Sequence, residues 1–185
     1  VLSADEAHEA CRALKGSALR QEVYALDEDG AIEFMYGVSE NSFEIKMLQP
    51  LGEKRHAVFF VHPQEKIDYH YERNIKDQEI EDPRIGHSFT LDVDQYGNVL
   101  KSAAVGYGRA NPDSSLNDRE QKKQTQILIT YTENEFTKNI DLENDYRTPL
   151  PCETRTYELT ELKPSQGPSP GQLRFSFKGL LDSIL

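Results

Sequence analysis

Three histidines lie close together in the sequence and raise the question of a metal site. They are His56, His62 and His70. If His56 and His62 share one strand face, they stand about 20 Å apart at about 3.3 Å per residue, which is too far to hold one ion directly. His70 would approach either of them only through pairing in a hairpin. We therefore expect histidines in surface or hydrogen-bonding roles and no metal site.

Asp68 and His70 fall on one face of a predicted strand, where a hydroxyl group could complete part of a hydrolase triad. The chain has no Gly-x-Ser-x-Gly nucleophile motif, and alternation with Ile67 and Tyr69 favours a solvated polar face. Residues 106–109, GYGR, lack the third glycine and the helix of a dinucleotide-binding motif. We expect no catalytic residue, no cofactor and no enzymatic activity.

The chain has nine Tyr and eight Phe without Trp, and side chains of this kind could line a groove for a carbohydrate or a peptide. Tyr69, Tyr71, Tyr131 and Tyr157 sit in predicted strands, where cross-strand packing is the more common role. A glycan- or protein-binding β module remains the alternative function.

The charge and length of the chain exclude several classes of partner. A net charge of −11 over 185 residues opposes binding to nucleic acid or anionic membranes. No apolar run is long enough to span a bilayer, and no signal peptide opens this segment. From Val1 in place of Met and the apolar end Ile184-Leu185 we expect a piece of a longer protein, and a native terminus stays open.

Cys11 and Cys152 are the two cysteines of the chain. They are too few for a disulfide framework and lack the CxxC spacing of a zinc site. We expect both to be small buried residues, and a single bridge between them stays open.

The elements that would position these side chains predict a mainly β fold, an antiparallel meander with a short N-terminal helix over residues 4–15. The helix starts at a capping box, Ser3 to Glu6, and ends near Gly16. The predicted strands are Arg20 to Leu26, Phe34 to Val38, Phe43 to Leu48, His56 to Val61, Ile67 to Arg73, His87 to Val93, Val99 to Gly106, Ile127 to Thr132 and Thr154 to Leu159.

Three segments follow from this pattern: a β-rich unit over 1–163, a connector rich in Pro, Gly and Ser over 164–171, and a strand or helix over 172–185. Residues 110–120 are polar and predict a surface loop with a helical turn. Apolar residues without alternation over 57–61 indicate a strand buried on both faces, whereas the alternating strand from Ile67 is buried on one.

A β-hairpin over Phe89 to Arg109 is the clearest local pattern. Phe89, Leu91 and Val93 alternate with polar residues, as in a half-buried strand. The following residues, 94–98 (DQYGN), supply turn chemistry because Gly and Asn tolerate positive φ.

Several blocks together resemble the middle-to-C-terminal region of the B component of insecticidal toxin complexes, the TcdB-like proteins. They are EACRALKGSALRQEVYALD (9–27), RHAVFFVHPQEKIDYHYER (55–73), DPRIGHSFTLDVDQYGNVLKSAAVGYGR (82–109), ILITYTEN (127–134) and YRTPLPCETRTYEL (146–159). The turn at 94–98 is similar to a YD-type turn, although Val93 replaces the usual Tyr before the aspartate.

The resemblance implies a structural role without enzymatic activity. In that family the B component joins a C component to form a hollow β-sheet shell around the toxic part of the C component. Other parts of the B component dock this shell on the A-component channel. The resemblance thus implies a segment of a curved sheet like that of Rhs and YD-repeat proteins, in a secreted toxin complex. The family's autoproteolytic aspartates belong to the C component, so no site residue is carried over.

Overall fold

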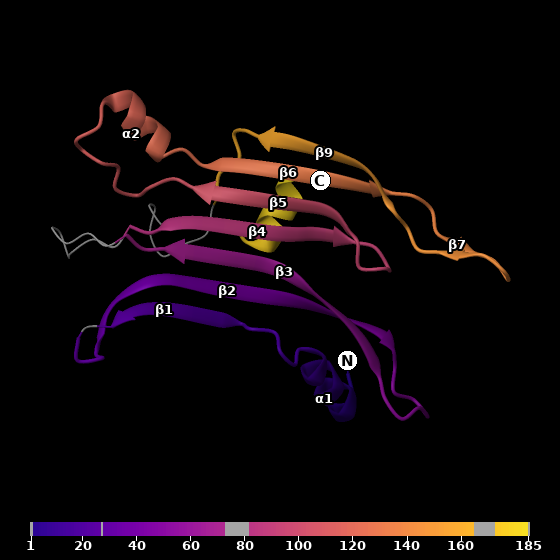
Figure 1. The fold of residues 1–185 in the computed structure, drawn as a ribbon. Helices are drawn as coiled ribbons and strands as arrows, with labels where there is room; N and C mark the ends of the chain where they lie inside the picture. Colours follow the sequence, from indigo (N-terminus) through magenta and orange to yellow (C-terminus); the bar gives the residue numbers. More distant parts are fainter. Residues whose placement is uncertain (1, 27, 73–81, 165–172, 185) are drawn as a thin grey trace.

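The computed structural model describes residues 2–26, 28–72, 82–164 and 173–184. A sheet of seven antiparallel strands makes up most of it, and Figure 1 shows how these strands lie side by side. In spatial order the strands are β1 (Arg20–Leu26), β2 (Ile32–Gln49), β3 (Val58–His70), β4 (Arg84–Val93), β5 (Val99–Tyr107), β6 (Leu128–Phe136) and β9 (Pro151–Leu159). A small ribbon of β7 (Ile140–Asp141) and β8 (Tyr146–Arg147) precedes β9. The helices are α1 (Ala4–Ala13), α2 (Asp118–Gln124) and α3 (Phe177–Ile184). The predicted antiparallel, mainly β fold with an N-terminal helix is confirmed.

Two pairs of predicted strands are in fact single long strands. The segments predicted at 34–38 and 43–48 both belong to β2, and those at 56–61 and 67–73 belong largely to β3. Pro63 does not break β3, because it lies at a bulge: Ser42 pairs with Glu65 and Phe43 with Pro63, which leaves Gln64 without a partner. The Ser42 hydroxyl accepts the Glu65 N–H at 3.1 Å and so satisfies a donor beside the interruption.

The first half of β3 is less buried than predicted. Val58 is 44% exposed, and Phe59 and Phe60 are half-buried rather than covered on both faces. The reason is the extent of β4, which pairs with β3 only from Glu65 to His70. Residues 58–64 therefore pair with β2 alone.

Helix α1 begins with the predicted capping box. The Ser3 hydroxyl accepts the Glu6 N–H at 3.3 Å, and the Glu6 carboxylate accepts the Ser3 N–H at 2.9 Å. Glu6 also accepts the Leu51 N–H at 3.0 Å, which joins the helix to the connection between β2 and β3. After the helix Gly16 takes a φ of 88°, the left-handed geometry expected of it.

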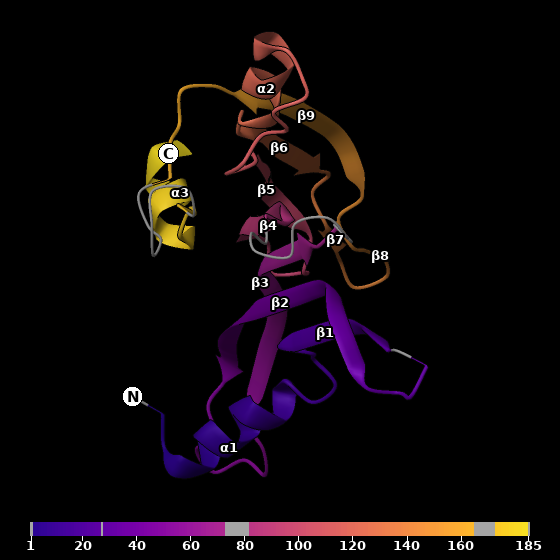
Figure 2. The same ribbon diagram turned by 90° about the vertical axis from the view of Figure 1, so that its left-hand side faces the viewer.

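Helix α3 lies against one face of the sheet (Figure 2). Leu180 is fully buried, and with Phe175 it packs on a row of apolar side chains from the three central strands β4, β5 and β6. That row is Phe89, Ala103, Val105 and Ile129. The segment predicted as a strand or helix over 172–185 is therefore helical from Phe177, and its side chains cover this part of the core. The connector predicted over 164–171 falls almost wholly outside the described residues.

Both cysteines are exposed and unpaired, so the prediction that they are buried is wrong. Cys11 lies on α1, whose single buried residue is Ala10. Cys152 lies on β9, an edge strand whose side chains are exposed on both faces. The predicted loop over 110–120 is confirmed as a surface segment leading into α2, none of whose residues is buried. No helix among the described residues is long and apolar enough to cross a membrane.

The predicted hairpin is formed by β4 and β5, and Asp94 organises its turn. The Asp94 carboxylate accepts the Tyr96 N–H at 2.8 Å, the Asn98 N–H at 2.8 Å and the Asn98 side-chain amide at 2.9 Å. Burial opposes ionisation of Asp94, yet these hydrogen bonds, with one from Gly97, lower its pKa overall. Gly97 takes a φ of 86°, which closes the turn.

We predict that Asp94→Ala lowers the free energy of unfolding by about 1–2 kcal/mol, because three donors lose their acceptor. Urea denaturation followed by circular dichroism measures the change. Asp92→Ala removes an exposed carboxylate two residues earlier and should stay within about 0.5 kcal/mol of the parent. Equal losses in the two variants would show that the turn contacts contribute nothing particular.

Candidate functional site

The three histidines considered for metal binding lie apart. His56 contacts Glu9 of α1 at 3.0 Å, and His62 contacts Glu44 of β2 at 3.3 Å. His70 is exposed at the end of β3. In the described part of the chain no three His, Cys, Asp or Glu side chains are placed to hold an ion.

Asp68 and His70 do not form part of a triad. The Asp68 carboxylate contacts the Lys66 ammonium at 2.9 Å and accepts a hydrogen bond from Ser39. A triad needs the hydroxyl on the imidazole, whereas Ser39 donates to the carboxylate. Within the described ranges no hydrogen bond joins His70 to Asp68 or to a hydroxyl group.

Cross-strand packing accounts for two of the four tyrosines that were considered for a binding groove. Tyr131 on β6 pairs in register with Tyr157 on β9, and their rings stack with centroids 6.1 Å apart. Tyr131 is buried, and Tyr157 is 43% exposed at the sheet edge. Tyr69 is half-buried in β3.

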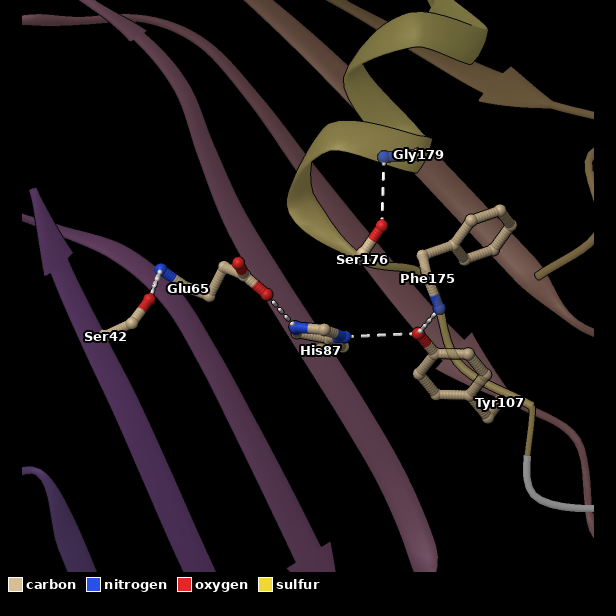
Figure 3. Close-up of polar contacts among 7 residues, drawn as sticks. All are labelled: Ser42, Glu65, His87, Tyr107, Phe175, Ser176 and Gly179. Atoms are coloured by element: carbon tan, nitrogen blue, oxygen red, sulfur yellow. Dashed lines mark hydrogen bonds and ion pairs between the residues drawn. The ribbon is translucent and has the colours of Figure 1, made fainter. Parts of the chain in front are cut away.

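A different polar cluster lies under the C-terminal segment, centred on His87 of β4 (Figure 3). This imidazole is 6% exposed. Its Nδ1 lies 3.1 Å from the Tyr107 hydroxyl of β5, and its Nε2 lies 3.2 Å from a Glu65 carboxylate oxygen of β3. The Tyr107 oxygen also accepts the Phe175 N–H at 3.0 Å. Three strands and the residues before α3 are thus joined by one chain of hydrogen bonds.

The directions of these hydrogen bonds fit a neutral imidazole. The Phe175 N–H donates to the Tyr107 oxygen, so the phenol hydrogen is free to donate to Nδ1 of His87. Nε2 then carries the ring proton and donates to Glu65. In this arrangement every donor of the chain has an acceptor, which a buried polar cluster needs.

The electrostatics of the cluster agree with that assignment. Burial, and secondarily the positive charge of Arg174, lower the pKa of His87 to about 4. Burial also raises the pKa of Tyr107 to about 12 and raises the pKa of Glu65. At neutral pH both His87 and Tyr107 are therefore uncharged.

Sequence reasoning missed this cluster, although one signal for it was present. His87 is in phase with Phe89 and Leu91, the residues of the predicted strand that face the core. A histidine in that phase is expected to be buried and hydrogen-bonded. Its partners Glu65 and Tyr107 come from other strands, and only the strand register brings them together.

The opposite face of the central strands has a different character. It holds an open depression of about 540 Å³ lined largely by hydroxyl and small side chains, among them Ser88, Thr90, Ser102, Ala104, Thr130 and Thr132. Glu65 and Lys66 of β3 are the ionisable residues that line the depression.

Comparison with known families gives one finding. A family model described as the insecticide toxin TcdB middle/C-terminal region matches residues 9–150. The match spans the second half of α1 and all of β1 to β8, and it leaves β9 and α3 outside. A search of curated proteins found no match.

The Tyr107 hydroxyl is the link between the sheet and the residues before α3. We predict that Tyr107→Phe lowers the free energy of unfolding by about 1–3 kcal/mol, because Nδ1 of His87 and the Phe175 N–H lose their partner in a buried site. Urea titration measures the effect. Tyr96→Phe makes the same change on a tyrosine that is 38% exposed and should leave stability within about 0.5 kcal/mol. Equal midpoints for the two variants would contradict the assigned role.

Proposed function

The chain belongs to the family of insecticide toxin TcdB middle/C-terminal regions, and from this premise we propose that it is a wall segment of a β-sheet shell that encloses a cytotoxic polypeptide. The role is structural and not enzymatic. Its partner is the C component of the toxin complex with its enclosed toxic region, and other parts of the B component contact the A-component channel. The assembled complex is secreted, and its sheet is of the Rhs type.

The state of the two edge strands is the observation that carries this proposal. All residues of β1 except Ala25 and all residues of β9 except Leu159 are exposed. Among the described residues no strand pairs with the outer edge of either one. Unpaired edges with apolar side chains such as Val23 and Leu26 invite aggregation in a free-standing domain, so natural sheets cover them. Continuation of the sheet on both sides into neighbouring parts of the same shell would cover these edges.

The two sheet faces also suit a wall. One face carries the apolar core under α3, which gives the sheet rigidity. The other face presents hydroxyl groups over its central strands. In a shell wall one face packs on a supporting layer and the other face stays open, and this sheet has one face of each kind.

Protease protection of the enclosed polypeptide tests the proposal in the full-length B component joined to its C component. We predict that the toxic region resists proteinase K in the parent complex. Ile129→Lys should make it digestible, because a charge in the core breaks the wall. Thr130→Lys is the matched control: it puts the same charge on an exposed neighbour opposite Glu158, and protection should remain.

Two outcomes would overturn the shell role. Digestion of the toxic region at the same rate in the parent complex and in the C component alone would show that nothing is enclosed. Full protection in an assembled Ile129→Lys complex would show that this sheet is not part of the barrier.

A further inference from the structure

The C-terminal segment, residues 173–184, is attached to the sheet by apolar side chains and a small polar contact. Phe175 and Leu180 supply the apolar part. The polar part is the hydrogen bond from the Phe175 N–H to Tyr107, with the Arg174 guanidinium 4.6 Å from the centre of the Tyr107 ring. Both of these polar contacts therefore involve Tyr107, the residue that also contacts His87.

The charged and titratable groups around His87 come from each element packed on it. Glu65 approaches from β3, with Tyr69 of the same strand near the cluster, and Tyr107 approaches from β5. Arg174 approaches from the C-terminal segment. While it is ionised, Glu65 favours a positive imidazole, and burial raises the pKa of this carboxyl.

Protonation of His87 would act on the segment in two ways. A hydrogen on Nδ1 removes the acceptor of the Tyr107 O–H, so the buried chain of hydrogen bonds is no longer complete. The new positive charge also repels Arg174, which belongs to the segment itself. The backbone pairing of β4 with β3 and β5 does not involve the imidazole, so the sheet keeps its ladder.

We propose that His87 is an acid-sensitive latch, whose protonation releases the C-terminal segment 173–184 from the sheet while the seven strands stay paired. Release uncovers the apolar row of Phe89, Val105 and Ile129. The proposal goes beyond the shell role and does not depend on it, because α3 lies outside the range that matches the family.

The pH window follows from the sign of the shift. The pKa of His87 is lowered in the attached state, so attachment is favoured fully above the ordinary value of 6.5 and is lost progressively as the pH falls towards about 4. If the released imidazole returns to its ordinary pKa, the opening equilibrium of the segment rises about 30-fold between pH 7.5 and pH 5.

Hydrogen–deuterium exchange of the full chain tests this expectation. Protection of the peptide that contains the Leu180 amide, which donates to the Ser176 carbonyl, is compared at pH 7.5 and pH 5 after normalisation to the unfolded chain at each pH. We expect protection to fall about 30-fold for this peptide, while peptides from β5 and β6 stay protected. In His87→Gln the ratio of protection at pH 7.5 to protection at pH 5 should be close to one for this peptide. The matched control His56→Gln changes an exposed histidine that contacts Glu9 and should respond like the parent.

Each contrary outcome overturns the latch. The first is equal protection of the segment at pH 7.5 and pH 5 in the parent chain. The second is a parent-like fall in protection in His87→Gln. The third is loss of protection in β5 and β6 together with the segment. If His87→Gln does not fold, NMR titration of His87 in the parent chain decides: its protonation must coincide with loss of protection at Leu180. Titration at its ordinary pKa with the segment still protected would also exclude the latch.

Discussion

The fold depends on the burial of one row of apolar side chains beneath α3. Phe89, Val105 and Ile129 come from three neighbouring strands and are each 2% exposed, and Leu180 closes over them. Without that helix the central strands would present an apolar face to water. That exposure costs free energy, because an antiparallel sheet has one polar face that water can solvate and one apolar face that must be buried. The attachment of α3 therefore governs the core as well as the C-terminal segment.

The polar cluster lies at the border of this core and explains how the helix is held in one position. Apolar contacts are not directional, whereas the hydrogen bonds through Glu65, His87 and Tyr107 meet their partners in one arrangement. The bulge at Pro63 is part of the same design, because Glu65 is the first residue after it and its N–H is taken by Ser42. An irregularity of the β2–β3 pair thus lies directly beside the cluster.

The outer strands differ from this centre in their exposure to solvent. The central strands are covered on one face, whereas β1 and β9 are exposed on both faces, and no strand of the described ranges pairs with their outer edges. A sheet of this kind is suited to continue into a larger assembly, which agrees with membership in a toxin-complex family. Two sets of residues considered for binding chemistry make structural contacts: Tyr131 stacks on Tyr157, and Asp68 contacts Lys66.

The likeness to the TcdB region could be read from several blocks spread along the sequence. The local elements were predictable from the sequence as well, namely the cap at Ser3, the alternation from Phe89 and the turn at Asp94. The local elements depend on interactions between residues a few positions apart, so a short stretch of sequence is enough to predict them. Three outcomes needed the folded chain: Pro63 lies inside a strand, both cysteines are exposed, and His87 contacts Glu65 and Tyr107. Those outcomes depend on strand register and on where α3 packs, and contacts between residues distant in the sequence set both.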